Sequence, residues 1–164
     1  MAKKRKLNSI RLLEARKIPH EIHTYDARIR DAQAVAEAVG MPAETVFKTL
    51  VAEVPSQSKP ILVLLPCNST LNLKRLAKSL GAKKAALASH ADAEKLTGLQ
   101  VGGISALALL QKRWDVYLDK RALEQSHLVI SAGERGTQAR LETKAFIDLV
   151  SCEIIDVADA SESS

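Results

Sequence analysis

One segment of the chain is apolar at every position and has a proline at each end, Pro60-Ile-Leu-Val-Leu-Leu-Pro66. A short unbroken apolar run is typical of a strand that is buried on both faces. The two prolines mark the limits of the segment, because each interrupts regular backbone hydrogen bonding. Residues 60–66 are therefore predicted to form a fully buried strand, which commits the fold to a sheet.

The rest of the chain alternates between strand-like and helix-like segments without a regular period. Apolar or alternating residues predict strands at 20–25, 46–54, 85–88, 114–118, 128–130 and 153–157. Capping residues and terminal glycines predict helices at 9–17, 31–39, 72–80, 90–97 and 143–150, with Asn8 capping the first and a further helical turn at 41–45. This order indicates a single α/β domain with a mixed, curved sheet flanked by short helices.

Positive charge is concentrated at the N-terminal end of the chain. The 164 residues have a net charge of +5, but residues 1–17 contain seven lysines and arginines and one glutamate, so the other 147 are nearly neutral. A basic segment of this kind indicates contact with a polyanion, although a solvated tail has the same composition. We expect a basic disordered tail at 1–7, one domain at 8–157 and a disordered tail at 158–164.

The composition argues against several classes of protein. Aromatic residues make up 3% of the chain, which leaves little material for RNA-binding domains that stack bases on aromatic rings. Cys67 and Cys152 form no CxxC pair and have no histidine at ligand spacing, so neither a disulfide framework nor a metal site is expected. The chain has no apolar signal segment and no run that could span a bilayer, which predicts a cytoplasmic protein without membrane contact. It contains no G-x-G-x-x-G motif and no P-loop, and no cofactor is expected.

The sequence offers no nucleophile with an evident base beside it. It contains no G-x-S-x-G motif, and its four histidines are scattered at 20, 23, 90 and 127. Alternation along a strand sends His20 and His23 to opposite faces, which argues against a shared metal ion. Cys67 could act as a nucleophile only with a base nearby, and a buried structural thiol is the favoured interpretation.

Three segments are candidates for a functional site. Lys48 stands among apolar and β-branched residues in a predicted strand, so its charge is either directed into a cleft or exposed at a sheet edge. Gly102 and Gly103 allow backbone N–H groups to approach a ligand closely, or simply form a turn. The segment Ser131-Ala-Gly-Glu-Arg-Gly136 follows a strand, where it could line a pocket or form a hairpin.

The order and separation of these segments resemble the YbaK/EbsC family. The resemblance runs from about Asn8 to Val157 and is carried by Phe47-Lys48-Thr49-Leu50, Leu71-Asn72-Leu73-Lys74, Leu80-Gly81-Ala82-Lys83-Lys84, Gly102-Gly103-Ile104-Ser105 and Ser131-Ala132-Gly133-Glu134-Arg135-Gly136. This family includes the editing domain inserted in bacterial prolyl-tRNA synthetases and free-standing relatives.

The resemblance implies a partly barrel-like sheet with one cleft and an aminoacyl-tRNA deacylase activity. The implied substrate is Cys-tRNA(Pro), with Ala-tRNA(Pro) or another small aminoacyl group as an alternative, and prolyl-tRNA synthetase is a possible partner. The implied mechanism is substrate-assisted, because the thiol of cysteine or the ribose hydroxyl takes part in the reaction. The protein would then mainly position the ester and stabilise charge.

The resemblance also assigns roles to residues. Lys48 would hold the terminal phosphate or ribose, the amides of Gly102 and Gly103 would face the ester carbonyl, and Ser131 and Gly133 would line the amino-acid side. The predicted catalytic residues are Lys48 and Gly103. The predicted substrate-binding residues are Phe47, Thr49, Gly102, Ser105, Ser131, Gly133, Arg135 and Gln138.

The chain departs from the family pattern at three places. Ala106-Leu107-Ala108 replaces a usual Pro-x-Gly, and Gln138 stands where an aspartate is usual. Residues 28–31, near the expected pocket mouth, also differ from those of relatives. Gln138, Ala106 and Ala108 favour the alternative function, a non-catalytic or altered-specificity module that binds tRNA or a synthetase.

Overall fold

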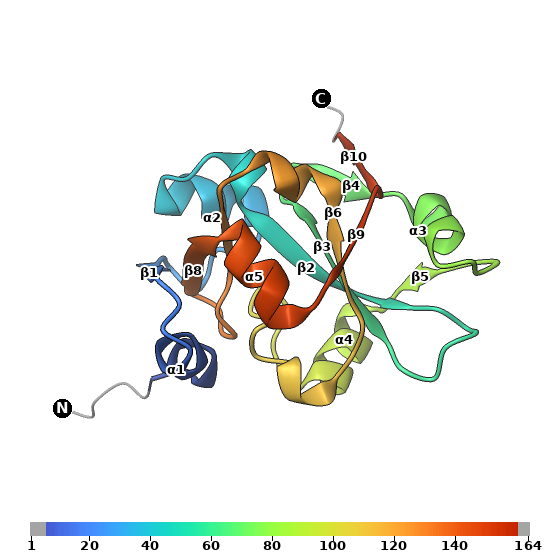
Figure 1. The fold of residues 1–164 in the computed structure, drawn as a ribbon, viewed down its shortest axis with the longest axis horizontal. Helices are drawn as coiled ribbons and strands as arrows, with labels where there is room; N and C mark the ends of the chain where they lie inside the picture. Colours follow the sequence, from blue (N-terminus) through green and yellow to red (C-terminus); the bar gives the residue numbers. More distant parts are fainter. Residues whose placement is uncertain (1–5, 161–164) are drawn as a thin grey trace.

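The structure, a computed structural model, describes residues 6–160 and contains one mixed α/β fold (Figure 1). The helices in this range are α1 (Asn8–Ala15), α2 (Ala32–Val39), α3 (Leu73–Ser79), α4 (His90–Thr97) and α5 (Thr143–Val150), with 3₁₀ turns η1 (Ala43–Thr45), η2 (Leu110–Lys112) and η3 (Lys120–Glu124). The strands are β1 (His20–Thr24), β2 (Phe47–Glu53), β3 (Ile61–Pro66), β4 (Ser69–Leu71), β5 (Ala86–Leu87), β6 (Val116–Asp119), β7 (His127–Ser131), β8 (Thr137–Glu142), β9 (Glu153–Ile155) and β10 (Ala158–Ala160).

The largest sheet is mixed, as predicted. Its strand order is β5-β2-β3-β6-β9, with β2 antiparallel to β3 and with β6 parallel to both β3 and β9. Strand β3 is buried at all six positions, which confirms the prediction from its unbroken apolar sequence. An antiparallel sheet of order β1-β8-β7 and the pair β10-β4 complete the strands of residues 6–160.

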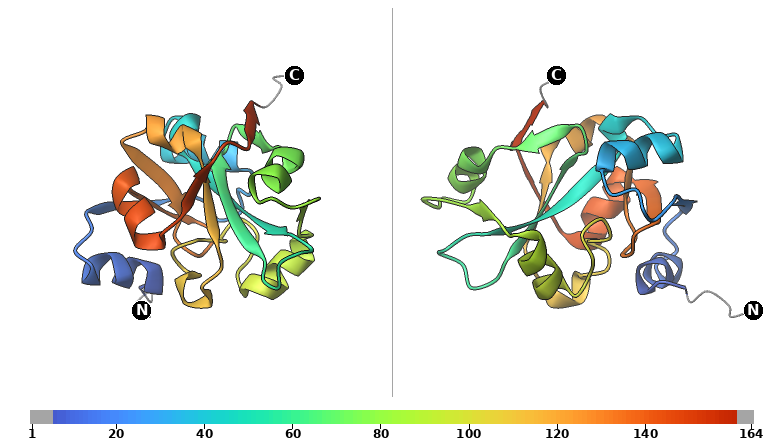
Figure 2. Two further views of the ribbon diagram at one scale, coloured as in Figure 1. Left: turned by 45° about the vertical axis from the view of Figure 1, so that its right-hand side comes forward. Right: turned by 180° about the vertical axis from the view of Figure 1, so that it is seen from behind.

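The sheets do not close into a barrel. A single parallel bridge between Val46 and Val129 joins the beginning of β2 to β7, so the two larger sheets meet at one corner. Helices α1 and α3 lie at opposite ends of the molecule (Figures 1 and 2). In residues 6–160, no helix has the length and apolar character needed to cross a membrane.

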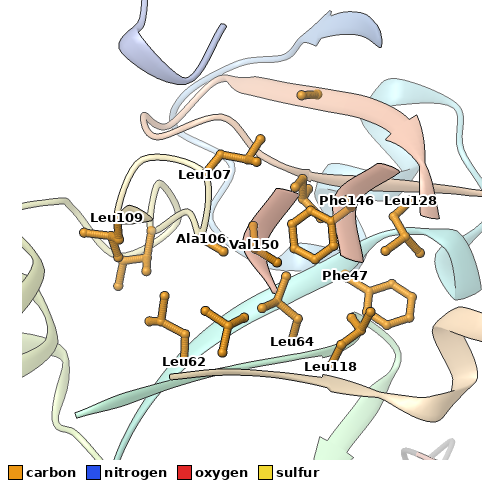
Figure 3. Packing of buried hydrophobic residues seen from close by; sticks show 14 of the residues in the cluster. Phe47, Leu62, Leu64, Ala106, Leu107, Leu109, Leu118, Leu128, Phe146 and Val150 are labelled. Carbon is orange, nitrogen blue, oxygen red and sulfur yellow. The ribbon is translucent and has the colours of Figure 1, made fainter. Parts of the chain in front are cut away.

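The central sheet separates two hydrophobic cores, because successive side chains of a strand point to opposite faces. Leu62 and Leu64 of β3 pack into the larger core with Phe47 and with Phe146 of α5 (Figure 3). Residues 61, 63 and 65 face the smaller core, where α3 contributes the fully buried Leu76. Strand β3 is buried on both faces and pairs along its length with β2, which carries Lys48.

Three helices begin as their capping residues predict. Asp31, Asn72 and Ser89 each accept a hydrogen bond from the backbone N–H three residues later, at 2.9–3.1 Å. The prediction for the first helix was wrong in its cap, because Asn8 is already inside α1. Leu7 occupies the cap position without a side-chain hydrogen bond.

The structure describes parts of the two segments predicted as tails, residues 6–7 and 158–160. Leu7 packs against the larger core, and residues 158–160 form β10, antiparallel to β4. The buried carboxylate of Asp119 accepts hydrogen bonds from the N–H groups of Val157 and Ala158, which leads the chain into this strand. Residues 1–5 and 161–164 lie outside the described range.

Candidate functional site

A cavity of about 580 Å³ lies beside the beginning of β2. Within residues 6–160, β2 pairs with β3 alone at residues 47–50, and β5 pairs with it at residues 52 and 53. Seven of the ten predicted site residues line the cavity, namely Phe47, Lys48, Thr49, Gly102, Ser131, Arg135 and Gln138. A second cavity of about 390 Å³, beside Trp114, contains none of the ten.

Lys48 is half-buried at the cavity. Its ammonium group donates a hydrogen bond to the carbonyl oxygen of Ser69 at 2.6 Å. Burial lowers the pKa of Lys48, and the nearby Cys67 and Asp31 oppose this shift. A lysine held in this way presents its remaining N–H groups to an anion or a carbonyl oxygen in the cavity.

Cys67 also lines the cavity, but it is a poor nucleophile. Its Sγ donates a hydrogen bond to the carbonyl oxygen of Ala43 at 3.3 Å. Burial raises the pKa of the Cys67 thiol to about 11, although the charge of Lys48 acts in the opposite direction. The group is therefore a protonated thiol near neutral pH, which agrees with the favoured structural interpretation.

Two buried side-chain oxygens at the cavity have no hydrogen-bond partner among residues 6–160. These are Thr49 Oγ1 and Gln138 Oε1, and Gln138 is only 6% exposed. Buried polar groups in folded proteins almost always have a partner, since an unpaired one costs about 1–3 kcal/mol. Both oxygens are enclosed, and they belong to residues that line the cavity.

Ser131 lies on the same wall of the cavity as Gln138, because the two residues are paired across β7 and β8. The Ser131 hydroxyl accepts a hydrogen bond from the N–H of Gly133 at 3.2 Å. Gly133 itself is not among the residues that line the cavity. It occupies a turn at a φ of 119°, and its predicted contact with the amino acid stays a prediction.

Gly103 is not among the residues that line the cavity, and its predicted catalytic role stays a prediction. Its N–H donates to the carbonyl oxygen of Gln100 at 2.8 Å and is therefore used within a turn. A Cβ at Gly103 would lie 2.8 Å from the Cα of Glu134 and 2.9 Å from the nitrogen of Arg135. This glycine thus permits close contact between two loops.

Ser105 is the third predicted residue outside the cavity. It is 1% exposed, and its hydroxyl accepts hydrogen bonds from the N–H groups of Leu107 and Ala108. Ser105 thus stabilises the turn that follows the glycine pair, and its predicted role in substrate binding stays a prediction.

Several residues that were not predicted as site residues complete the cavity wall. Arg30 and Asp31 come from the loop before α2, where the sequence departs from relatives, and His90 and Glu94 come from α4. Only the departure at residues 28–31 gave a sequence signal for this wall. The described residues contain no group of three or more His, Cys, Asp or Glu side chains that could hold a metal ion.

Comparison with known proteins agrees with this arrangement. Residues 26–149 match the model of the aminoacyl-tRNA editing domain family. The chain is 34% identical over 163 residues to an Enterococcus faecalis protein named "Putative Cys-tRNA(Pro)/Cys-tRNA(Cys) deacylase EbsC", covering 96% of this chain and 98% of that protein.

Two solved structures share the fold. One, described as a trans-editing enzyme for prolyl tRNA synthetase with the qualifier "putative", has a TM-score of 0.79 and 21% identity, covering 96% of this chain and all of the other. A second, of a hypothetical protein, has a TM-score of 0.83 and 18% identity, covering 93% of this chain and all of the other. The family match, the relative and the cavity together establish that this chain belongs to the aminoacyl-tRNA editing domain family.

Proposed function

We propose that this protein is a cytoplasmic trans-editing enzyme that hydrolyses the ester of mischarged tRNA, with Cys-tRNA(Pro) as its substrate. The observation that carries the proposal is the composition of the cavity. It combines the half-buried ammonium of Lys48 with two buried, unpartnered oxygens, and it contains a thiol too weakly acidic to be a nucleophile. The name of the Enterococcus relative supports cysteine as the amino acid removed.

The proposed reaction uses the thiol of the bound cysteine. Its sulfur attacks the carbonyl carbon of the ester, so that a C–S bond forms and the C–O bond to the ribose breaks. The ribose oxygen takes up the proton lost by the thiol, and the cyclic thioester that leaves is hydrolysed by water. This route explains why the protein needs no nucleophile of its own, since its work is to orient the ester and stabilise the oxyanion.

Each end of the substrate has a suitable group in the cavity. Lys48 uses one N–H for Ser69 and directs its positive charge to the terminal phosphate or ribose. Thr49 and Gln138 supply acceptors for the α-ammonium group and the thiol of the aminoacyl end. The N–H of Gly102, in place of that of Gly103, is assigned to the carbonyl oxygen undergoing attack.

The second candidate is a binding module that holds aminoacyl-tRNA, or prolyl-tRNA synthetase, without hydrolysis. The neutral carboxamide of Gln138 favours it, because an amide cannot supply the negative charge of a carboxylate to an α-ammonium group. In this case the bound ester would be protected from spontaneous hydrolysis. A hydrolase would instead accelerate its loss.

A panel of tRNA(Pro) charged with radiolabelled cysteine, alanine, serine or proline tests the proposal. We expect multiple-turnover release of cysteine and little release of proline. Lys48→Met should lower the release rate by roughly 100-fold or more, as for removal of one charge-stabilising group. Lys59→Met, in the exposed β2–β3 connection, is the matched control and should retain the wild-type rate. Protection of every ester from hydrolysis would select the binding module.

A further inference from the structure

Both backbone polar groups of Val101 are bound by an ion pair at the cavity. The N–H of Val101 donates to Oε2 of Glu94 at 2.8 Å, and its carbonyl oxygen accepts from Nε of Arg135 at 2.6 Å. Nη2 of Arg135 lies 3.9 Å from the same Glu94 oxygen. Val101 is therefore held from two sides by side chains that also contact each other.

The two charged residues come from distant parts of the fold. Glu94 belongs to α4, and Arg135 lies in the connection between β7 and β8. The side chain of Arg135 is 19% exposed, so its hydrogen bond to Val101 is charge-assisted and partly shielded from water. Arg135 donates its Nε–H to the carbonyl oxygen of Val101. Its position therefore suits support of the loop around Val101 better than direct recognition of tRNA.

This support determines the direction of the next N–H group. The Val101–Gly102 peptide is trans, and in a planar trans peptide the carbonyl and the N–H point to opposite sides. When Arg135 fixes the Val101 oxygen, it also fixes the N–H of Gly102 on the far side of the peptide plane. Among residues 6–160 this N–H donates to no other residue, and Gly102 lines the cavity.

Gly102 would otherwise be free to turn. Its φ of 93° lies in a region that glycine enters easily, and with no side chain the neighbouring peptide can rotate at little steric cost. The stem of Arg135 closes one side, because a Cβ at Gly102 would lie 3.4 Å from Arg135 Cγ. The arginine therefore restricts the loop by packing as well as by hydrogen bonding.

We propose that the Glu94–Arg135 ion pair is a positioning device that keeps the Gly102 N–H directed at the carbonyl oxygen of the aminoacyl ester. This inference rests on the proposed function of the cavity. Neither charged residue acts on the reacting atoms, and both act through the Val101–Gly102 peptide. Loss of the pair should weaken stabilisation of the transition state more than binding of the substrate.

Steady-state deacylation kinetics test the device. Arg135→Met keeps an apolar stem over Gly102 and removes the donors, so kcat should fall by roughly 10- to 100-fold while KM changes little. Arg135→Lys retains one donor for the Val101 oxygen and should recover part of kcat. Arg140→Met is the matched control. Arg140 lies on β8, just after the connection that carries Arg135, but it pairs with Glu21. This variant should have the wild-type kcat.

A double-mutant cycle tests whether Glu94 and Arg135 act together or as two independent contacts. If Glu94 and Arg135 act through the same peptide, Glu94→Gln combined with Arg135→Met should cost little more than Arg135→Met alone. Additive losses of kcat would overturn a common action. An unchanged kcat, or a rise in KM alone, in Arg135→Met would also overturn the inference.

A measurement without substrate keeps this inference distinct from the proposed function. In ¹⁵N-labelled protein, the amide signal of Gly102 should shift or broaden in Arg135→Met and stay in place in Arg140→Met. An unmoved Gly102 signal overturns the positioning role. A wild-type protein that releases no amino acid from any aminoacyl-tRNA overturns the proposed function instead.

Discussion

The ammonium of Lys48 is anchored by the carbonyl oxygen of Ser69, at a distance of 2.6 Å. The two residues belong to β2 of the central sheet and to β4 of the two-stranded sheet. The contact uses one of the three N–H groups of the lysine and leaves two for a ligand. The charge is thus fixed in place before substrate binds, which is the condition for electrostatic stabilisation without reorganisation.

The lowered pKa of Lys48 predicts the response to alkaline pH. As the pH rises, the ammonium should lose its proton at a pH below 10.5. Enzymatic deacylation, measured relative to spontaneous hydrolysis, should decline over the same pH range. Stability should change in the opposite direction. Between the lowered pKa and the ordinary value of 10.5, the unfolded chain binds more protons, so the free energy of unfolding contributed by Lys48 rises with pH.

Denaturant titrations of wild type and Lys48→Met between pH 8 and 11 measure this contribution. The free energy of unfolding of the wild type, relative to that of Lys48→Met, should increase as the pH rises. A difference that is constant over this range would contradict the lowered pKa.

Thr49→Val should make the protein more stable and less active. The hydroxyl of Thr49 is buried without a partner, so replacing it with a methyl group of similar size should raise the free energy of unfolding by about 1 kcal/mol. Thr143→Val is the matched control, because the Thr143 hydroxyl donates to the Gln125 oxygen at 2.6 Å. It should lower stability by about 1 kcal/mol. Urea unfolding and deacylation assays on both variants provide the comparison.

Cys67→Ala should retain deacylase activity. The thiol donates to a backbone carbonyl and has a pKa raised to about 11, so it contributes no nucleophile at pH 7. Alkylation of the native protein by iodoacetamide at pH 7.5 should be slow at this residue and accelerate after unfolding. A Cys67→Ala variant that folds but releases no cysteine from the charged tRNA would show that the thiol takes part in the reaction.

Gly103→Ala should lower stability by about 1–3 kcal/mol, because a Cβ there would meet the backbone of residues 134 and 135 at 2.8–2.9 Å. Gly81→Ala is the comparison without a collision. It has open space around the added Cβ, and its own cost comes from placing a side chain at a φ of 67°. Thermal unfolding should therefore show the larger loss for Gly103→Ala, and equal losses would argue against the collision.

The sequence predicted the elements whose burial is strong on one or both faces. Strand β3 has only apolar side chains, and α4 and α5 have the predicted ranges, 90–97 and 143–150. Strand β8 was not predicted because Gln138 and Arg140 interrupt its apolar residues. Gln138 is nevertheless buried, since it lies at the cavity rather than in water. A polar residue that lines the cavity thus concealed the strand that carries it.

The candidate site was predictable in its residues but only partly in their roles. The family resemblance identified both glycines of the 102–103 pair, while only the structure shows that Gly103 donates within a turn and that Gly102 lines the cavity. Arg135 was expected to bind substrate, and its bond to Val101 depends on the folding of two loops 34 residues apart. No local pattern contains that information.

The pairing of β10 with β4 has a practical consequence for any shortened version of this protein. Ala160 is aligned with Ser69, the residue whose carbonyl holds Lys48. A chain cut after residue 157, where the domain was expected to end, would lose the strand that braces this carbonyl. Expression designs should therefore keep at least residue 160, and attach any C-terminal fusion beyond it.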